Sequence, residues 1–198
     1  MEIKKYVLGP LATNTFLLIE GKDALLIDPA SKAEKLIEIL GDYNLVGILL
    51  THGHFDHIKA VDGLYDKYHC PIYIDQDDEQ LARDKNAGSE FGLVAYISSP
   101  INYIKEGNNN IGPFNFEIVK TPGHTPGSAI YIFDDHIFTG DTLFKQSVGR
   151  TDLKGGNFQD LKKSLQFFKN LDRDYIIHPG HEDDTLLSQE LKFNYFLQ

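Results

Sequence analysis

The nine residues Leu49–His57 constrain the fold of this chain more than any other feature. The apolar stretch Val46–Leu50 has the length and character of a strand that is buried on both faces of a sheet. Three histidines and an aspartate follow within six residues: His52, His54, Asp56 and His57. A chain with this order of residues is expected to form a sheet in which a buried strand ends directly at a polar site.

The residue types in this segment predict a metal site. Side chains alternate along an extended segment, so His52 and His54 are expected to point to the same side. Apolar residues then recur at helical spacing after Asp56, which puts Asp56 and His57 at the start of a helix. Imidazole and carboxylate groups suit zinc and similar divalent ions. The alternative is a surface cluster without a role, and three histidines beside an aspartate disfavour it.

In three later segments, too, a histidine or an aspartate follows an expected strand. His124 lies in the turn-rich loop Thr121–Ser128, Asp141 follows Phe138-Thr139-Gly140, and His181 follows Ile176–Gly180. A metal site built on a sheet needs candidate ligands at the ends of several strands. These segments are therefore expected to meet the first one.

The order of strand-like and helix-like segments predicts an α/β layered fold, in which helices cover sheet faces. The expected strands are 5–8, 14–20, 24–28, 46–50, a strand-like run at 69–74, and then 114–120, 129–133, 136–139 and 175–178. The expected helices are 31–40, one after residue 56, 158–169 and 186–196. Ser31 and Glu34 form the pattern of a capping box at the first helix.

Charge and composition limit the classes of molecule that this chain is expected to bind. The formal net charge of -10 disfavours nucleic acid as a partner, because an acidic surface repels phosphate. No apolar run approaches the roughly 20 residues of a membrane span, and the N-terminus lacks the apolar core of a signal peptide. Cys70 is the single cysteine, so an internal disulfide or a cysteine-based zinc site is excluded. The expected partner is a small-molecule substrate, and the expected compartment is the cytoplasm.

The sequence resembles the metallo-β-lactamase superfamily. The match comprises His52-Gly53-His54-Phe55-Asp56-His57, followed in the family's order by His124, Asp141 and His181. The resemblance spans nearly the whole chain and implies a single domain over residues 1–198, folded as an αββα sandwich of two mixed sheets flanked by helices. Thr121–Gly127 and Gly140–Phe144, followed by Gly149–Asp152, look most like the glyoxalase II-like hydrolases of that superfamily.

Residue by residue, the resemblance implies a site with two divalent metal ions. One ion would be held by His52, His54 and His124, and the other by Asp56, His57 and His181. Asp141 would bridge both ions, and Asp28 fits the family's early aspartate, which supports a ligand without binding metal. Zinc is the first expectation, with iron or manganese as alternatives, because the same ligands accept all three.

Such a site predicts hydrolysis by a metal-bridging hydroxide. Seven ligands do not fill two coordination shells, and open positions for water distinguish a catalytic site from a structural one. Two cations acidify a water so that it can attack a carbonyl at neutral pH. Asp56 is the candidate catalytic residue: it either transfers a proton while ligating or only ligates, and the sequence favours neither.

Weaker candidates surround this centre. Lys145 and Arg150 could hold a substrate carboxylate, or Arg150 could instead pair with Asp152. The segment Lys85–Pro100 is a candidate substrate loop with Phe91 and Tyr96 as contact surface. The remaining histidines, His69, His136 and His178, are interpreted as structural or exposed.

The expected substrate is a thioester of the glyoxalase II type or another small ester. Full glyoxalase II proteins carry a C-terminal helical domain, whereas only 17 residues follow His181 here (198 minus 181), and Glu182–Thr185 departs from the family's continuation. Two alternatives stand beside the hydrolase. One is a mononuclear iron persulfide dioxygenase, a related group that shares a Gly-Arg-Thr-Asp segment, and the other is a metal-binding module without catalysis.

Overall fold

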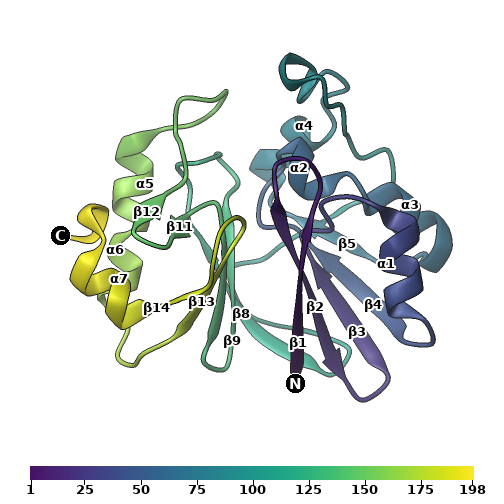
Figure 1. The fold of residues 1–198 in the computed structure, drawn as a ribbon, viewed down its shortest axis with the longest axis horizontal. Helices are drawn as coiled ribbons and strands as arrows, with labels where there is room; N and C mark the ends of the chain where they lie inside the picture. The colour runs from purple at the N-terminus through teal and green to yellow at the C-terminus, as the bar shows by residue number, and fades with distance from the viewer.

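The computed structural model describes residues 1–198 except for the side chain of Glu90. Two six-stranded sheets stand face to face in the middle of the molecule (Figure 1). The first sheet has the order β1-β2-β3-β4-β5-β6 and contains the N-terminal half of the chain. Its strands are β1 (Glu2–Leu8), β2 (Thr13–Glu20), β3 (Asp23–Ile27), β4 (Asn44–Leu49), β5 (Ile72–Ile74) and β6 (Asn102–Tyr103).

The second sheet has the order β14-β13-β10-β9-β8-β7. Its strands are β7 (Gly107–Ile111), β8 (Phe114–Lys120), β9 (Ala129–Phe133), β10 (His136–Gly140), β13 (Ile176–Pro179) and β14 (Thr185–Leu186). A small hairpin of β11 (Leu143–Phe144) and β12 (Ser147–Val148) stands beside it. Both large sheets are mixed, since β3–β6 and the pair β10–β13 run parallel while the other neighbours run antiparallel.

Helices cover the outer face of each sheet, which makes the four-layer αββα sandwich that the family resemblance implied (Figure 1). On the first sheet they are α1 (Ala33–Leu40), α2 (Phe55–Ile58), α3 (Val61–Tyr68) and α4 (Glu79–Ala82). On the second sheet they are α5 (Phe158–Ser164), α6 (Gln166–Lys169) and α7 (Leu187–Phe193). No helix in the described part of the chain combines the length and the apolar character needed to cross a bilayer.

Alternation along the central strands explains why four layers form. Phe16 and Leu18 on β2 join the core between the two sheets, whereas the intervening Leu17 joins the core beneath α1 and α3. Strand β3 divides its side chains in the same way, with Leu25 and Ile27 in one core and Ala24 and Leu26 in the other. A strand that is apolar at every position therefore needs cover on both faces, and each buried Leu, Ile or Phe contributes about 1.5–3 kcal/mol.

Three local expectations are wrong: the capping box, the continuous helix after Asp56, and the continuous helix over 158–169, which is divided into α5 and α6. No capping box forms, because α1 begins at Ala33, its N-cap residue Lys32 is left-handed, and no side chain caps the helix. The expected continuous helix after Asp56 is split into α2 and α3. The backbone N–H of Ala60 donates to the carbonyl of Pro29 at 3.0 Å, a bond to a segment outside the helix, and the helix breaks there.

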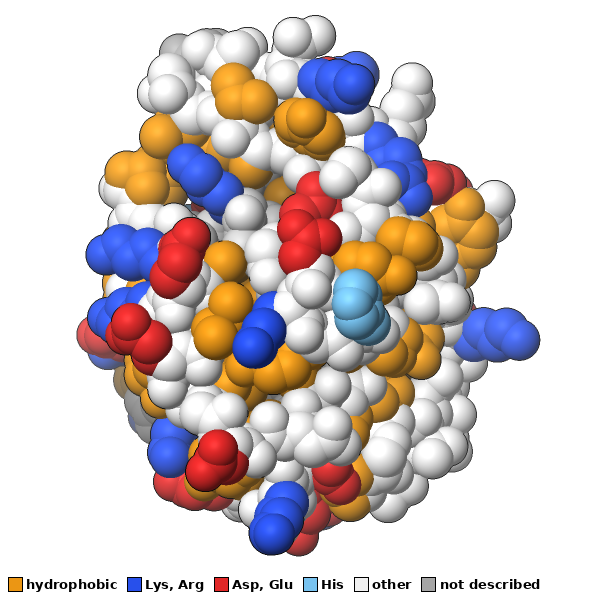
Figure 2. Space-filling model, turned by 90° about the vertical axis from the view of Figure 1, so that its right-hand side faces the viewer, with side chains coloured by type: hydrophobic (Ala, Val, Ile, Leu, Met, Phe, Trp, Pro, Cys, Tyr) orange, Lys and Arg blue, Asp and Glu red, His pale blue; other side chains and the backbone are white. Residues whose placement is uncertain are grey.

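Charges are interspersed over the face that α1 and α3 cover. Figure 2 shows basic and acidic side chains mixed with apolar ones on this side of the molecule. The acidic excess of the chain is therefore not gathered into a single field on this face.

Candidate metal centre

The carboxyl ends of strands from both sheets meet at one edge of the sandwich. Strands β3 and β4 are parallel in the first sheet, and β10 and β13 are parallel in the second. The candidate ligands follow these strands directly: His52, His54, Asp56 and His57 after β4, His124 after β8, Asp141 after β10 and His181 after β13. The structure thus brings together all seven residues that the sequence singled out.

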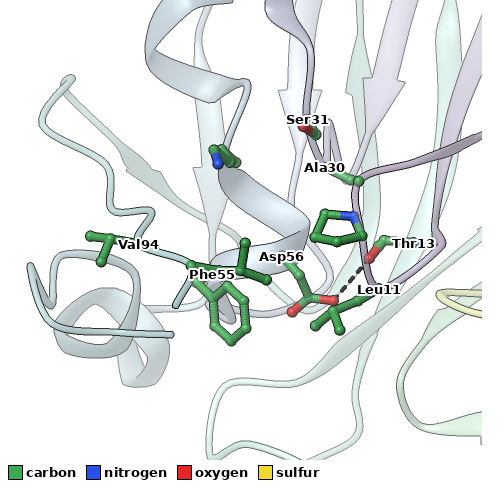
Figure 3. A pocket seen from close by; sticks show the side chains of 11 residues that line it. Leu11, Thr13, Ala30, Ser31, Phe55, Asp56 and Val94 are labelled. Atoms are coloured by element: carbon green, nitrogen blue, oxygen red, sulfur yellow. Dashed lines mark hydrogen bonds between the residues drawn. The ribbon is translucent and has the colours of Figure 1, made fainter. Parts of the chain in front are cut away.

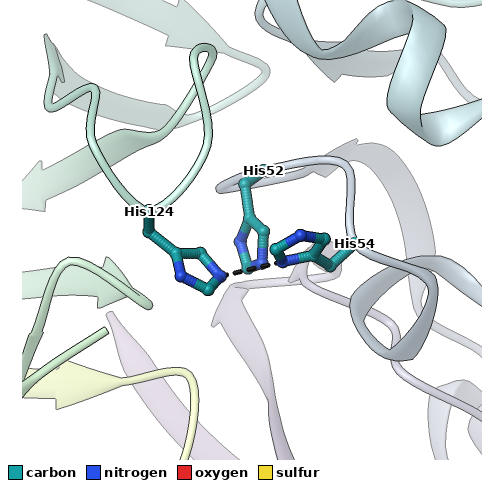
Figure 4. Close-up of side chains that lie close together, drawn as sticks. All are labelled: His52, His54 and His124. Atoms are coloured by element: carbon teal, nitrogen blue, oxygen red, sulfur yellow. Dashed lines mark hydrogen bonds between the residues drawn. The ribbon is translucent and has the colours of Figure 1, made fainter. Parts of the chain in front are cut away.

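Three buried histidines form the first cluster, which we call the histidine triad: His52, His54 and His124 (Figure 4). One nitrogen of each lies within 4.8 Å of the others. His54 Nδ1 and His124 Nε2 are 2.8 Å apart, a hydrogen-bond distance. His52 Nε2 is buried without a hydrogen-bond partner, which is costly for a polar atom unless something else binds it.

Asp56, His57 and His181 form the second cluster, which we call the mixed triad. Its three atoms are nearly equidistant. His57 Nε2 lies 3.4 Å from His181 Nε2 and 3.6 Å from Asp56 Oδ2, and the latter two atoms are 3.3 Å apart. Two ligands that each lie about 2.1 Å from a tetrahedral zinc ion are about 3.4 Å from one another. The spacing of the mixed triad therefore fits a metal ion.

Asp141 lies between the triads and contacts both. Its Oδ2 is 3.4 Å from His124 Nε2 in the histidine triad and 3.5 Å from His181 Nε2 in the mixed triad. Its Oδ1 is 3.4 Å from His57 Nε2 and has no hydrogen-bond partner. Oδ2 therefore faces both triads, and Oδ1 faces the mixed triad only.

Oxygen atoms outside the centre bind the far nitrogen of most of these histidines. His57 Nδ1 donates to Asp28 Oδ2 at 2.9 Å, His124 Nδ1 to the carbonyl of Arg150 at 2.7 Å, and His181 Nδ1 to the carbonyl of Leu11 at 3.1 Å. A carboxylate or carbonyl accepts only from an N–H, so the Nε2 atoms are turned toward the centre. Histidines that bind metal are usually oriented in this way.

Asp28, which follows β3, is hydrogen-bonded to the segment that follows β4. Its carboxylate accepts from the backbone N–H of Thr51 at 2.8 Å and from the Thr51 hydroxyl at 2.6 Å, in addition to His57. The Thr51 hydroxyl in turn lies 3.0 Å from His52 Nδ1. Asp28 therefore acts on the orientation of His52 and His57, which is the position that the sequence comparison with the superfamily implied.

Burial and neighbouring charges set opposite proton affinities in the two triads. Burial lowers the pKa of His52 well below its ordinary value and that of His54 to about 3, so both imidazoles are neutral. Burial also opposes the charged form of His57, but the nearby carboxylates of Asp56, Asp141 and Asp28 outweigh it and raise this pKa well above the usual range. The protein without metal thus holds a proton in the mixed triad.

The two carboxylates of the centre are ionised despite their burial. Burial would raise the pKa of Asp141, yet the positive charge of the neighbouring His57 holds it well below its usual range. The same opposition leaves the pKa of Asp56 at about 2, lowered mainly by His57 and His181. Neutral imidazoles and ionised carboxylates are the forms that bind a divalent cation.

Gly180 permits the close approach of β13 to the centre. A Cβ at this position would lie 2.3 Å from Asp141 Oδ1 and 2.7 Å from His57 Cε1. Its backbone N–H donates to the carbonyl of Gly140 at 2.7 Å, so the strands that carry Asp141 and His181 are joined directly at the centre.

One buried carboxylate that supports the centre was missed in the sequence. Asp78 accepts from the backbone N–H of Gly53 at 2.7 Å, from that of Gly127 at 2.7 Å and from the hydroxyl of Thr125 at 2.7 Å. It therefore ties the loop that carries His52 and His54 to the loop that carries His124. Its acidic neighbours, Asp77 and Glu79, make it look like part of a solvated surface run, and no local signal distinguishes it.

The weaker candidates lie around the centre with partners of their own. Arg150 donates through Nε and Nη2 to both carboxylate oxygens of Asp152, each at 2.7 Å, as the structural alternative predicted. Lys145 Nζ lies 3.7 Å from Asp183 Oδ2 and its side chain is half exposed. In the predicted substrate loop, Phe91 stacks on Phe55 with ring centroids 5.8 Å apart.

The remaining histidines lie outside the two triads. His136 Nδ1 is 2.9 Å from His178 Nε2, and His178 Nδ1 is 3.0 Å from Asp184 Oδ2. His69 is exposed at the end of α3. All three are thus structural or exposed, as interpreted from the sequence.

Known proteins resemble this chain over its whole length. The model of the family described as "Metallo-beta-lactamase superfamily" matches residues 8–181. Hydroxyacylglutathione hydrolase GloC of Haemophilus influenzae is 35% identical over 187 residues, which cover 89% of this chain and 88% of GloC.

Solved structures are equally similar. BLEG-1, described as a B3 metallo-beta-lactamase, has a TM-score of 0.91 and 36% identity, with 100% of both chains covered. The di-iron-bound form of TTHA1623 has a TM-score of 0.90 and 35% identity, and covers 98% of this chain and 100% of its own. The fold described above is therefore shared with these proteins, one of which holds two iron ions.

Proposed function

The chain belongs to the metallo-β-lactamase superfamily, a family of metal-binding hydrolases, and on that premise we propose that it is a dinuclear hydrolase of a thioester or a related small ester. The observation that carries this proposal is the position of Asp141, which contacts the histidine triad and the mixed triad at once. Two complete ligand sets that share one carboxylate support two ions rather than one.

The histidine triad would hold one ion and the mixed triad the other, with Asp141 shared between them. The unpartnered Nε2 of His52 and Oδ1 of Asp141 support this assignment, because each is a buried lone pair aimed into the centre. Zinc is proposed first, since neutral imidazoles and a carboxylate at tetrahedral spacing suit it. The di-iron form of TTHA1623 makes iron the principal alternative.

When bound, the two ions would lower the pKa of a water molecule and draw electron density from a substrate carbonyl. Hydrolysis then adds the water oxygen to the acyl carbon, breaks the carbon–sulfur bond, and releases a carboxylic acid and a thiol that carries the second proton. The chain itself holds the ligands in place. Its seven ligand side chains do not fill the coordination shells of two ions, so positions remain open for water and substrate.

Asp56 has the geometry of a ligand whose orientation is restrained. The hydroxyl of Thr13 donates to its Oδ2 at 2.9 Å, and the same oxygen faces His181 Nε2. We propose that Asp56 ligates through this oxygen. A role in proton transfer would use the other oxygen and is separable by experiment, because Asp56→Asn keeps an oxygen for ligation but removes the basic carboxylate.

The thioester assignment is supported by the similarity to hydroxyacylglutathione hydrolase GloC, because a hydroxyacylglutathione is a thioester. The alignment covers 88% of GloC, so the two proteins are similar in length. BLEG-1 makes β-lactams the competing substrate class, which a substrate panel must include.

The test combines elemental analysis with a hydrolysis screen on metal-loaded protein. We expect two ions per chain and turnover of thioesters above that of a β-lactam, a lactone and a phosphodiester. His124→Ala and His181→Ala should each remove one ion and lower kcat/KM by more than the about 100-fold that loss of a supporting partner costs. His69→Asn is the control, because His69 is exposed and left-handed, a conformation that asparagine tolerates.

Two results would overturn the proposal. One iron per chain with thiol-dependent oxygen uptake would identify the dioxygenase alternative. Two bound ions without turnover of any substrate in the panel would indicate a metal-binding module.

A further inference from the structure

Each triad takes ligands from both sheets, so each depends on how the two sheets are joined at the centre. In the histidine triad the link is Asp78, which is hydrogen-bonded to loops from both halves of the chain. In the mixed triad, Asp56 and His57 follow β4 of the first sheet, whereas His181 follows β13 of the second. Residues 11–14, which lead into β2, are hydrogen-bonded to both of these sides.

Asn14 binds the chain around His181 through three hydrogen bonds. Its backbone N–H donates to the carbonyl of Gly180 at 2.7 Å. Its side-chain Nδ2 donates to the carbonyl of Pro179 at 2.8 Å and to that of Glu182 at 2.9 Å. Asn14 is 1% exposed, so one buried side chain holds carbonyls on both sides of a proposed ligand.

The amide group of Asn14 can take only one orientation. Exchange of its nitrogen and oxygen would place the oxygen against two carbonyl oxygens, neither of which can donate a hydrogen bond. In the observed orientation Oδ1 is buried without a hydrogen-bond partner, which is rare for a polar atom in a protein. An apolar residue would remove this unpaired oxygen but would leave two carbonyls without their donor, so the amide is needed for its two N–H groups.

The residues just before Asn14 bind two of the ligands themselves. The carbonyl of Leu11 accepts from His181 Nδ1 at 3.1 Å, and the hydroxyl of Thr13 donates to Asp56 Oδ2 at 2.9 Å. Figure 3 shows this second bond on the wall of a small cavity that Leu11, Thr13 and Asp56 line together. Thr13 and His181 also form an isolated antiparallel bridge. Asn14 therefore fixes a segment that in turn holds ligands from both sheets.

We propose that residues 11–14 position the mixed triad, with Asn14 as their anchor, and thereby decide whether its ion binds. The inference rests on the two-ion centre of the proposed function and adds the residue on which the second ion depends. Asn14 is not a proposed ligand, and it acts through the carbonyls on both sides of His181. The histidine triad is linked by Asp78 instead and has no ligand in these two segments, so loss of Asn14 affects one site only.

The experiment measures the stepwise zinc affinity of Asn14→Ala by chelator competition on the metal-free full chain. The binding step that disappears in His181→Ala identifies the mixed triad. We expect Asn14→Ala to weaken this step about 10–100-fold, the loss that follows removal of a supporting partner, and to change the other step less than about 2-fold. A residue that only stabilised the fold would not weaken one step selectively.

Asn109→Ala is the matched control, because Asn109 Nδ2 also donates to two backbone carbonyls, those of Lys105 and Gly107, each at 2.7 Å. Asn109 lies on β7, an edge strand of the second sheet, and no proposed ligand lies on this strand. Both zinc affinities of this variant should equal those of the wild type. A second readout is kcat/KM at limiting zinc, which should be low in Asn14→Ala and should recover when free zinc is raised by the factor that the affinity lost.

Thr13→Val tests the same segment if Asn14→Ala does not fold, because it removes the hydroxyl bonded to Asp56 and keeps the shape of the side chain. The step assigned to the mixed triad should weaken in Thr13→Val and should not weaken in Thr13→Ser, which keeps the hydroxyl.

Unchanged affinities, or equal weakening of both steps, in Asn14→Ala would overturn the inference alone, and so would unchanged affinities in Thr13→Val. Two ions bound by the wild type without turnover of any substrate would refute the proposed hydrolysis, while a loss confined to one step would still support the role of Asn14. A single ion per wild-type chain would refute both.

Discussion

Replacing Asp78 with asparagine should loosen the histidine triad and leave the mixed triad intact. The two oxygens of Asp78 accept three hydrogen bonds: Oδ2 from Gly53 N–H and the Thr125 hydroxyl, and Oδ1 from Gly127 N–H. An asparagine offers one acceptor oxygen and one NH2 group. In either orientation the NH2 group faces a backbone N–H, so at least one of the two loops loses its bond.

The magnitude follows from one broken bond to a buried carboxylate. A buried donor left without its partner costs about 1–3 kcal/mol. Part of this loss is offset, because burial opposes the charged form of Asp78 and raises its pKa, a penalty that a neutral amide avoids. We expect a loss of about 2 kcal/mol in the free energy of unfolding, which lowers Tm by about 4–8 °C in a domain of this size. Metal affinity at the histidine triad should fall about 10–100-fold.

The assay is chelator competition with zinc, resolved into two binding steps, together with thermal unfolding of the metal-free protein. Asp77→Asn is the control, since Asp77 precedes Asp78 but is exposed. A fall in affinity confined to one step, with Asp77→Asn unchanged, is the expected result. Equal weakening of both steps, or a Tm equal to that of Asp77→Asn, would show that Asp78 does not act through the two loops.

Three further outcomes are expected. Gly180→Ala should expel the ion from the mixed triad, because its Cβ would lie 2.3 Å from Asp141 Oδ1; elemental analysis that still finds two ions would contradict this. Zinc affinity at the mixed triad should rise with pH between about pH 5 and 8, because an ion must displace the proton that nearby carboxylates hold on His57. Zinc affinity at the histidine triad should change little over this range, because the pKa of His54 is about 3. Calorimetry in buffers of different ionisation enthalpy measures the protons released at each binding step. Burial raises the pKa of the Cys70 thiol to about 11, so a disulfide reagent at about pH 8 should label it only after unfolding, and rapid labelling of native protein would refute that burial.

The fold could be predicted from the sequence wherever its signal is local. Phe114, Phe116 and Ile118 alternate with exposed residues, and the structure has a strand over these positions with the same alternation. The apolar run before His52 is β4, buried as expected. Such patterns are visible in one dimension because the period of a strand is a property of the backbone itself. Ser31 does not cap α1, because the helix begins only at Ala33 and the left-handed Lys32 occupies the N-cap position.

The identities of the candidate ligands could likewise be predicted, because histidines and aspartates that directly follow strands are recognisable from the sequence alone. What only the tertiary structure decided is their mutual placement. Asp141 follows His57 by 84 positions, yet its Oδ1 lies 3.4 Å from His57 Nε2, because two sheets packed face to face bring their strand ends to one edge. Asp78 supports the loops of three histidines, and the cavity that Asp56 lines combines four separate segments of the chain. Distances between segments remote in sequence are set by how the layers pack, and no local pattern encodes them.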